Sequence, residues 1–173
     1  MTADWTALAA TSKHESVLRR FRCASPNAAW EVEAETWVRH DAIAWAAFPT
    51  EMDERVLLLF DDASALAGIA AHTLEDSIAT GIDGTFLTRR LSAIAVSTNW
   101  QGCCDANGAR VSDVLLDTAL ADIRLRPERV TFINAFVRER NIRSRLFLGR
   151  NGFAEYPSSG VPGLLRMTLQ DDE

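Results

Sequence analysis

The sequence predicts an α/β fold in which helices flank a central mixed β-sheet. Arg55 to Phe60 and Leu66 to Leu74 are β-favouring segments separated by an aspartate-rich turn, a pattern typical of an antiparallel hairpin. Arg90 to Ser97 is nearly all small or apolar, which favours a strand at the centre of the sheet. An amphipathic helix over 111–123 then leads to a strand at 130–137, and this strand–helix–strand order predicts two parallel strands.

The N-terminal part is expected to add one strand and one long helix. The first dozen residues read as a frayed or weakly helical lead, and the loose alternation over 16–23 predicts a first strand. Ser25 and Pro26 have the preferences of an N-cap and a first helical position. We therefore expect a helix over about 26–47, ending before the next proline.

Three further segments complete the predicted order. Two glycines favour a loop over 76–88. A short helix is predicted over 141–150, where Asn151 and Gly152 form a C-terminal stop signal, and a last strand over 164–169. No repeat or linker interrupts this order, so we expect one domain over residues 1–173.

Composition excludes several classes of protein. A chain of 173 residues with 47% hydrophobic content can form a real core. No apolar run approaches the roughly 20 residues of a membrane helix, and the N-terminus has no pattern of a signal peptide. Three cysteines make no disulfide framework, which favours a cytoplasmic protein.

Charge is distributed unevenly along the chain. The net charge of −6 disfavours a general nucleic-acid binder, since phosphates need a basic surface. However, residues 110–150 hold nine arginines against five acidic residues. Two interpretations remain open, a local site for an anionic ligand or ordinary solvated faces.

Three motifs in the region 55–170 resemble those of the GNAT acetyltransferase superfamily. An apolar strand ending in Ala-Val, followed by an aromatic-Gln-Gly triplet, stands at 94–102, and an amphipathic helix follows it. The third motif, which is the family's second signature, places an asparagine at the start of a short helix that finishes in Gly-Phe. Here its members are Asn141, Ser144, Phe147, Gly152 and Phe153. The resemblance implies a GNAT-like acyl-CoA N-acyltransferase fold with acetyl-coenzyme A (acetyl-CoA) as co-substrate.

The resemblance also implies which residues bind acetyl-CoA. Free amides at a helix start bind a diphosphate through their N–H groups and the helix dipole. Diverging parallel strands leave backbone groups that pair with the pantetheine arm. The implied binding residues are Ile94, Ala95, Val96, Asn107, Gly108, Ala109, Arg110, Ser112, Asn141 and Phe147.

Two departures from the family pattern stand in these motifs. The glycine-rich turn of the family is interrupted here, and Arg110 and Ser112 stand where small residues normally let the backbone approach phosphate. Arg110 either supplies a charged contact or blocks the groove. Leu148 occupies the position of the family's tyrosine, which resembles a proton donor to the departing thiolate, and the only tyrosine is Tyr156.

A base must remove a proton from the attacking amine. The candidates are Glu75 and Asp76 at the end of the hairpin, His72 before them, and Ser92 on the central strand. Each also has a structural interpretation: a satisfied strand histidine, turn charges, and a packing serine.

Cysteine and tryptophan residues allow two interpretations each. Cys103 and Cys104 precede a helix start that can lower a thiol pKa, but they also fit a loop insertion without a role. They have no histidine nearby, so no metal site is expected. Trp30, Trp37 and Trp45 lie at helical spacing and fit a core stripe or a wall of the acceptor site.

These observations lead to one function and two alternatives. The first is an N-acetyltransferase acting on a primary amine of a small molecule, peptide or protein. The second is a toxin-type GNAT that acetylates aminoacyl-tRNA, which would use arginines 138, 140, 143 and 145. The third is a non-catalytic acyl-CoA-binding module. The loops at 48–54, 76–88 and 154–163 are expected to set the acceptor, and exposed sheet edges are compatible with a homodimer.

Overall fold

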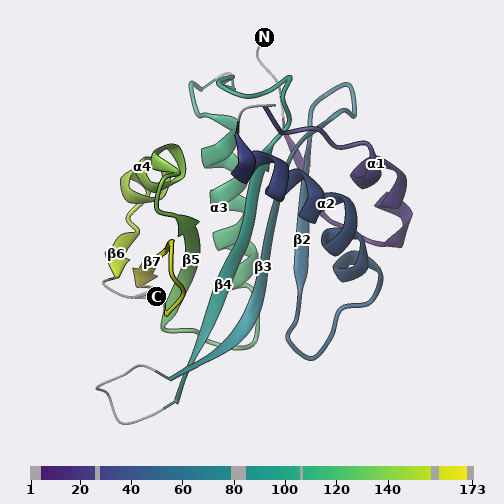
Figure 1. The fold of residues 1–173 in the computed structure, drawn as a ribbon. Coiled ribbons are helices and arrows are strands. Elements are labelled where there is room, and N and C mark those ends of the chain that lie inside the picture. Colours follow the sequence, from purple (N-terminus) through teal and green to yellow (C-terminus); the bar gives the residue numbers. More distant parts are fainter. Residues whose placement is uncertain (1–4, 26–27, 79–84, 106, 157–159, 171–173) are drawn as a thin grey trace.

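The computed structural model describes residues 5–25, 28–78, 85–105, 107–156 and 160–170. These residues form a seven-stranded mixed sheet with the order β1-β2-β3-β4-β5-β7-β6 (Figure 1). Its strands are β1 Thr6–Ala9, β2 Arg55–Phe60, β3 Leu66–Ile78, β4 Thr85–Val96, β5 Phe132–Arg138, β6 Ala154–Tyr156 and β7 Leu164–Gln170. Neighbouring strands are antiparallel except for the parallel pair β4–β5. The predicted mixed sheet is confirmed.

Helices cover both faces of this sheet (Figure 1). The helices are η1 Ser12–His14, α1 Glu15–Arg19, α2 Ala29–Ala47, α3 Val111–Arg124 and α4 Ile142–Arg150. Side chains of α1 and α2 join one buried cluster, and those of α3 and α4 join the other. In the described parts of the chain, no helix is long and apolar enough to cross a membrane.

Strand β2 explains how one sheet supports two cores. All four of its central residues are buried. Leu57 and Leu59 face the cluster under α3, whereas Val56 and Leu58 face the cluster under α1 and α2. Because successive side chains of a strand point to opposite faces, a continuous apolar run is what a doubly covered strand requires.

Helix α3 approaches the sheet closely at Gly68 of β3. A Cβ atom at Gly68 would lie 2.5 Å from Cδ1 of Leu115 and 2.9 Å from the carbonyl oxygen of Ala95. Only glycine gives the helix this approach. The contact fixes α3 across β3 and β4, so that the start of α3 lies near the C-terminal end of β4.

The predicted elements from residue 55 onward are confirmed with small shifts of their ends, but the N-terminal predictions are partly wrong. The expected frayed lead contains β1, and the expected strand at 16–23 contains α1. Leu18 and Phe21, three positions apart, are buried against α2, so their spacing is helical rather than alternating. Ser25 does not cap α2, whose N-cap is Ala28, and Pro26 lies outside the described residues.

Two further differences concern the hairpin and the C-terminus. The expected loop at 76–88 is largely strand, because β3 continues to Ile78 and β4 starts at Thr85. The short strand β6 was not predicted, and it pairs with β7 at the edge of the sheet. Three residues are too few to produce a detectable alternation.

Candidate functional site

The site begins where β4 and β5 diverge. Their pairing runs from Thr88 with Phe132 to Leu91 with Ala135, and in the described residues it ends there. Strand β4 continues to Val96 and β5 to Arg138 without pairing to each other. Backbone groups on the facing edges are therefore available to a ligand rather than to a neighbouring strand.

A β-bulge marks the same point on β4. Ala71 pairs with Ala93 and His72 pairs with Leu91, which leaves Ser92 as the extra residue. Such a bulge bends its strand and ends regular pairing. Ser92 lines the resulting cavity, whose volume is about 900 Å³.

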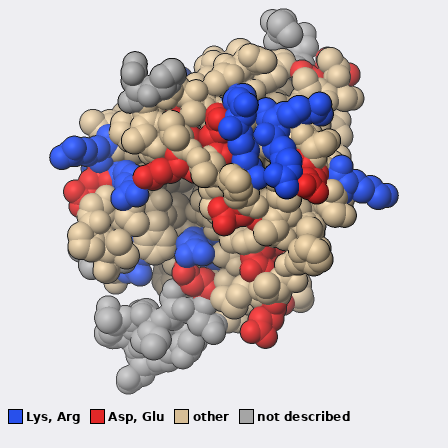
Figure 2. Space-filling view, turned by 45° about the vertical axis from the view of Figure 1, so that its right-hand side comes forward, with Lys and Arg blue, Asp and Glu red and all other residues tan. Residues whose placement is uncertain are grey.

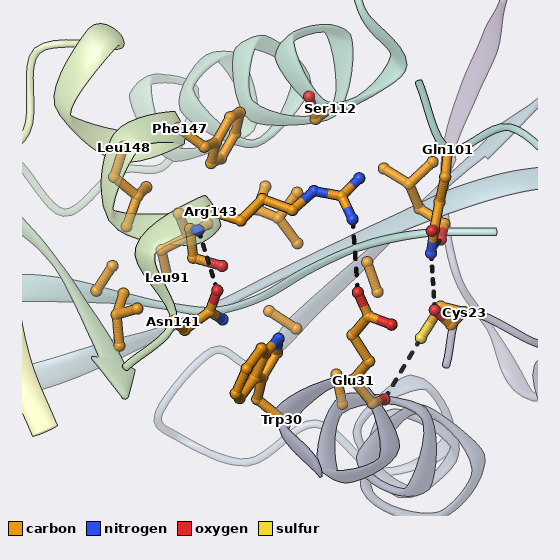
Figure 3. Close-up of a pocket in the computed structure, with 18 of the residues that line it drawn as sticks. Cys23, Trp30, Glu31, Leu91, Gln101, Ser112, Asn141, Arg143, Phe147 and Leu148 are labelled. Carbon is orange, nitrogen blue, oxygen red and sulfur yellow. Dashed lines mark hydrogen bonds and ion pairs between the residues drawn. The ribbon is translucent and has the colours of Figure 1, made fainter. Parts of the chain in front are cut away.

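Five elements enclose this cavity. The facing ends of β4 and β5 form its floor, the start of α3 and the inner side of α4 form one wall, and the first turns of α2 form the opposite wall. Figure 3 shows Trp30 and Glu31 of α2 opposite Phe147 and Leu148 of α4. Predicted binding residues Ile94, Ala95, Val96, Arg110, Ser112, Asn141 and Phe147 all line the cavity.

The turn before α3 is closed by a carboxylate. Asp105 accepts hydrogen bonds from the backbone N–H groups of Asn107 and Ala109, each 2.8 Å long, and its carbonyl accepts from Gly108 N–H. The expectation that these three amides are free is therefore wrong. These three residues do not line the cavity, and the Asp105 carboxylate already takes the amides of two of them.

Other amides of this segment remain open toward the cavity. The short bridge between Cys104 and Arg110 is held by Val111 N–H to Cys103 and Asp105 N–H to Ala109. In the described part of this segment, no partner is recorded for the backbone N–H groups of Gly102, Cys104, Arg110 and Ser112, all of which line the cavity. Ser112 lies in the first turn of α3, where the helix dipole favours a bound anion.

Arginines make the cavity basic in a protein that is acidic as a whole. Its lining holds Arg110, Arg138, Arg143 and Arg150 against Glu31 and Glu33. Arg138 pairs with Glu33 at 3.0 Å, Arg143 with Glu31 at 3.5 Å, and Arg150 with Asp113 at 2.6 Å. In the described part of the chain, Arg110 has no ion pair, so its charge is available to a ligand.

Helix α4 presents an amide and an aromatic ring. The side-chain oxygen of Asn141 accepts from Ser144 N–H at 3.1 Å and caps the helix, which leaves its NH₂ group for another acceptor. Phe147 lies under Arg150, whose guanidinium carbon is 5.1 Å from the ring centroid. Leu148 is buried and packs in the core cluster, so this wall offers no hydroxyl at that position.

Comparison with known proteins bears on this arrangement. No protein-family profile and no curated protein sequence matches the chain. The PaiA N-acetyltransferase from Thermoplasma acidophilum, in complex with coenzyme A, has a TM-score of 0.65 and 13% identity, covering 97% of this chain and 99% of its own. A GNAT-family acetyltransferase from Staphylococcus aureus has a TM-score of 0.64 and 9% identity, covering 96% and 99%.

A third similar structure is a mutant of the AtaT toxin bound to the C-terminus of the antitoxin AtaR. Its TM-score is 0.67 at 13% identity, and the match covers 94% of this chain and 92% of that one. The chain has the GNAT acetyltransferase fold. The identities are low, so the likeness is one of fold, and the site has to be argued from its own residues.

His72 lies outside the cavity, in a buried network on the α3 side of the GNAT fold. Its Nε2 is 3.0 Å from Asp122, and its Nδ1 is 3.0 Å from a guanidinium nitrogen of Arg89. A neutral ring with the proton on Nε2 donates to Asp122 and accepts from Arg89, which uses both nitrogens. Burial, opposed by the hydrogen bond to Asp122 and aided by the Arg89 charge, lowers the pKa of His72.

The other base candidates are also placed by the structure. Glu75 pairs with Arg90 at 3.5 Å on the hairpin and does not line the cavity. The backbone of Asp76 belongs to β3, but its side chain lies outside the described residues. Of the three candidates whose side chains are described, Ser92 is the one that the fold brings to the cavity.

Several lining residues were not singled out from the sequence. Glu31, Glu33 and Cys23 give no signal of their own, since single acidic residues on a helix look like a solvated face. Burial and then the charges of Glu35 and Glu31 raise the pKa of Cys23 to about 12, so this thiol stays protonated. Among the described residues Trp30 belongs to neither core cluster, whereas Trp37 and Trp45 pack together at 5.1 Å.

Proposed function

We propose that this chain is an N-acetyltransferase that transfers an acetyl group from acetyl-CoA to a primary amine of a small molecule, peptide or protein. The observation that carries the proposal is the divergence of β4 and β5 beyond Leu91 and Ala135. It opens a cavity of about 900 Å³ next to the unpaired amides at the start of α3. An amide-bearing arm that ends in a diphosphate matches both features.

Individual residues have distinct parts in this proposal. The backbone of Ile94 to Val96 would pair with the pantetheine amides along the open edge of β4. The N–H of Ser112 and the guanidinium of Arg110 would hold the diphosphate in place of the amides that Asp105 occupies. The free NH₂ of Asn141 would donate to the pantetheine arm from the α4 wall.

The chemistry needs little from the protein beyond positioning. Acetyl-CoA supplies a thioester whose carbonyl carbon bonds to the amine nitrogen as the carbon–sulfur bond breaks. Glu33 is the more exposed of the two cavity carboxylates, 58% against 18% for Glu31, and it is our candidate to accept the first amine proton. Leu148 cannot donate a proton, so the second amine proton reaches the thiolate through water.

Calorimetry with acetyl-CoA tests the binding half of this proposal. Ser112→Glu places a carboxylate in the first turn of α3, where the dipole stabilises it, so the fold is kept while an anion is repelled. We expect micromolar-range binding by the wild type and at least about tenfold weaker binding by Ser112→Glu. Ser112→Ala is the matched control and should bind like the wild type. Wild-type protein that shows no heat and no thermal shift at millimolar acetyl-CoA contradicts the proposal.

Release of free thiol in the presence of an amine panel tests the catalytic half. A non-catalytic acyl-CoA-binding module is the alternative, and two observations favour it. His72 and Glu75 lie outside the cavity, and Leu148 stands where the family has a tyrosine. Binding without transfer to any amine would select the module, whereas transfer that Ser112→Glu abolishes and Ser112→Ala retains would exclude it.

Acetylation of aminoacyl-tRNA is a further candidate, favoured by the likeness to a toxin structure at a TM-score of 0.67. Two of the four arginines named for it, however, are held by carboxylates in hydrogen-bonded ion pairs: Arg138 by Glu33 and Arg145 by Glu155. Figure 2 shows one compact group of basic side chains, with acidic side chains interleaved elsewhere. Growth arrest on expression together with acetylation of aminoacyl-tRNA in vitro would support this candidate, and normal growth would exclude it.

Two further predictions accompany the proposed function. The cysteines Cys23, Cys103 and Cys104 are free thiols, in keeping with the proposed cytoplasmic location. The homodimer expected from exposed sheet edges stays a prediction.

A further inference from the structure

One ion pair crosses the cavity. Arg143 extends from α4 past Phe147, and its guanidinium ends at the carboxylate of Glu31 on α2, at 3.5 Å (Figure 3). Both residues line the cavity. Any extended ligand that enters between α4 and α2 therefore meets this pair.

The two partners differ in how firmly they are held. Glu31 accepts a hydrogen bond from Ser25 N–H at 2.7 Å, its side chain is 18% exposed, and its carbonyl accepts a weak bond from the thiol of Cys23. The side chain of Arg143 is 68% exposed, and Glu31 is the one partner recorded for it among the described residues. Arg143 is therefore the partner that can move, and Glu31 is the fixed anion.

The ion pair between Arg143 and Glu31 is weak enough for a phosphate to replace Glu31. An ion pair with one largely exposed partner and a 3.5 Å separation changes an equilibrium by at most about fivefold. The phosphates of coenzyme A together carry more charge than one carboxylate, and each accepts from a guanidinium through two oxygens, which gives shorter and stronger hydrogen bonds than a single 3.5 Å contact. Phosphate would thus displace Glu31 at little cost.

A neighbouring pair provides a contrast. Arg138 of β5 also pairs with a carboxylate of α2, that of Glu33. This pair, however, makes three hydrogen bonds of 3.0 to 3.3 Å. In this geometry Nε and one terminal nitrogen of the arginine donate to both carboxylate oxygens. Arg143 makes one longer contact, so of the two it is the arginine available for exchange.

We propose that Arg143 binds a phosphate of the acyl donor and that Glu31 holds this arginine across the cavity until the phosphate replaces it. This inference rests on the proposed function, because acetyl-CoA supplies the phosphates. Glu31 then acts as an internal competitor of the ligand. It weakens binding by the amount needed to break its pair with Arg143, and in exchange it keeps Arg143 aimed into the cavity.

Calorimetry with coenzyme A and with dephospho-coenzyme A tests the inference. Glu31→Gln keeps the acceptor for Ser25 N–H but removes the charge, and we expect it to tighten coenzyme A binding about three- to fivefold. Arg143→Gln should weaken binding about tenfold. The double variant should match Arg143→Gln alone, because Glu31 acts only through this arginine. Glu155→Gln is the control, because Glu155 pairs with Arg145 and does not line the cavity, and it should not tighten binding.

Comparison of coenzyme A with dephospho-coenzyme A, which lacks the 3′-phosphate, shows which phosphate Arg143 binds. If Arg143 takes the diphosphate, Glu31→Gln tightens both ligands, and if it takes the 3′-phosphate, only coenzyme A binds more tightly. Wild-type binding that Glu31→Gln leaves equal or weaker overturns this inference and leaves the proposed function intact. A gain from Glu31→Gln that persists without Arg143 also overturns it. Absence of binding by the wild type and every variant overturns both proposals.

Discussion

The two ends of α3 face two arginine clusters that differ in their access to water. At its C-terminal end, Arg89 is fully buried and contacts His72, Asp53 and Glu128. At its N-terminal end, Arg110 and Arg143 project into an open cavity, and their side chains are largely exposed. The sequence does not distinguish the two clusters, because the partners of Arg89 and of Arg143 lie far from them in the chain.

Burial decides what each cluster can do. A buried guanidinium keeps its partners, since losing them would leave a charge in a medium of low dielectric constant. An exposed guanidinium exchanges its partner for a ligand at small cost. The C-terminal cluster therefore holds the fold together, and the N-terminal cluster is suited to binding.

The largest expected effect comes from breaking the buried cluster. Arg89→Met removes the buried cation that contacts both His72 and Asp53, so we expect a loss of about 3–5 kcal/mol in the free energy of unfolding. Urea denaturation measures this loss. Arg19→Met, on the exposed surface of α1, is the control and should change stability by less than about 0.5 kcal/mol. A loss below 1 kcal/mol for Arg89→Met would remove the distinction between the clusters.

Substitution of Arg110 tests whether the exposed cluster at the N-terminal end of α3 binds acetyl-CoA. Arg110→Gln should weaken acetyl-CoA binding about tenfold, or roughly 1.4 kcal/mol, because it removes an unpaired cation from the cavity. Stability should stay within about 0.5 kcal/mol of the wild type. Calorimetry and thermal unfolding on one sample check both values, with Arg19→Gln as the control. Tighter binding would mean that Arg110 blocks the groove.

Acid should affect the buried cluster first. Because the pKa of His72 is lowered in the folded state, the unfolded chain binds a proton near pH 6.5 that the folded chain does not. The contribution of neutral His72 to the free energy of unfolding is therefore fully present above pH 6.5. Below pH 6.5 the free energy of unfolding falls by up to about 1.4 kcal/mol per pH unit. His72→Gln keeps a donor for Asp122 and an acceptor for Arg89 but does not titrate, so its profile between pH 7.5 and 5 should be flatter.

Protonation of Asp122 does not contribute to the change in stability between pH 7.5 and 5. Burial raises its pKa, but hydrogen bonds from His72 and Arg55 outweigh burial and hold the pKa of Asp122 well below its usual range. Its contribution to stability is lost only below pH 3.8. A wild-type profile that runs parallel to that of His72→Gln between pH 7.5 and 5 would contradict the neutral assignment of His72.

The smallest expected effect is on stability at Arg143. Arg143→Gln should change the free energy of unfolding by less than about 1 kcal/mol, since its pair with Glu31 is exposed and long. Chemical denaturation beside Arg89→Met gives the direct contrast. A loss as large as that of Arg89→Met would assign Arg143 to the fold rather than to a ligand.

Much of the fold could be predicted because its signals are local. The apolar run of β2, the small residues of β4 and the stripe of α3 each identify an element without knowledge of the rest. Prediction failed at α1 and β1, which have five and four residues. Elements of that length owe their form to the α2 and β2 surfaces they pack against.

The candidate site could be predicted only in part. Its β4 and α4 residues follow from motifs, and the structure places them in the cavity. For the α2 wall the sequence offered only the tryptophans as one of two interpretations, and Trp30 and Trp37 line the cavity. Its carboxylates could not be found, since the pair Arg138–Glu33 joins residues 105 positions apart. Asp105 was overlooked for a different reason: that its carboxylate occupies the turn depends on how the chain folds back between Cys104 and Arg110.

The sequence by itself determined the order of strands and helices from residue 55 onward, because periodicity, helix stops and apolar runs act between near neighbours in the chain. Only the tertiary structure decided which arginines are buried and which meet water, and which amides before α3 stay open. Those outcomes depend on contacts between distant segments, such as His72 with Asp122 across 50 positions. Burial sets the strength of a charge interaction, and burial exists only once the layers have packed.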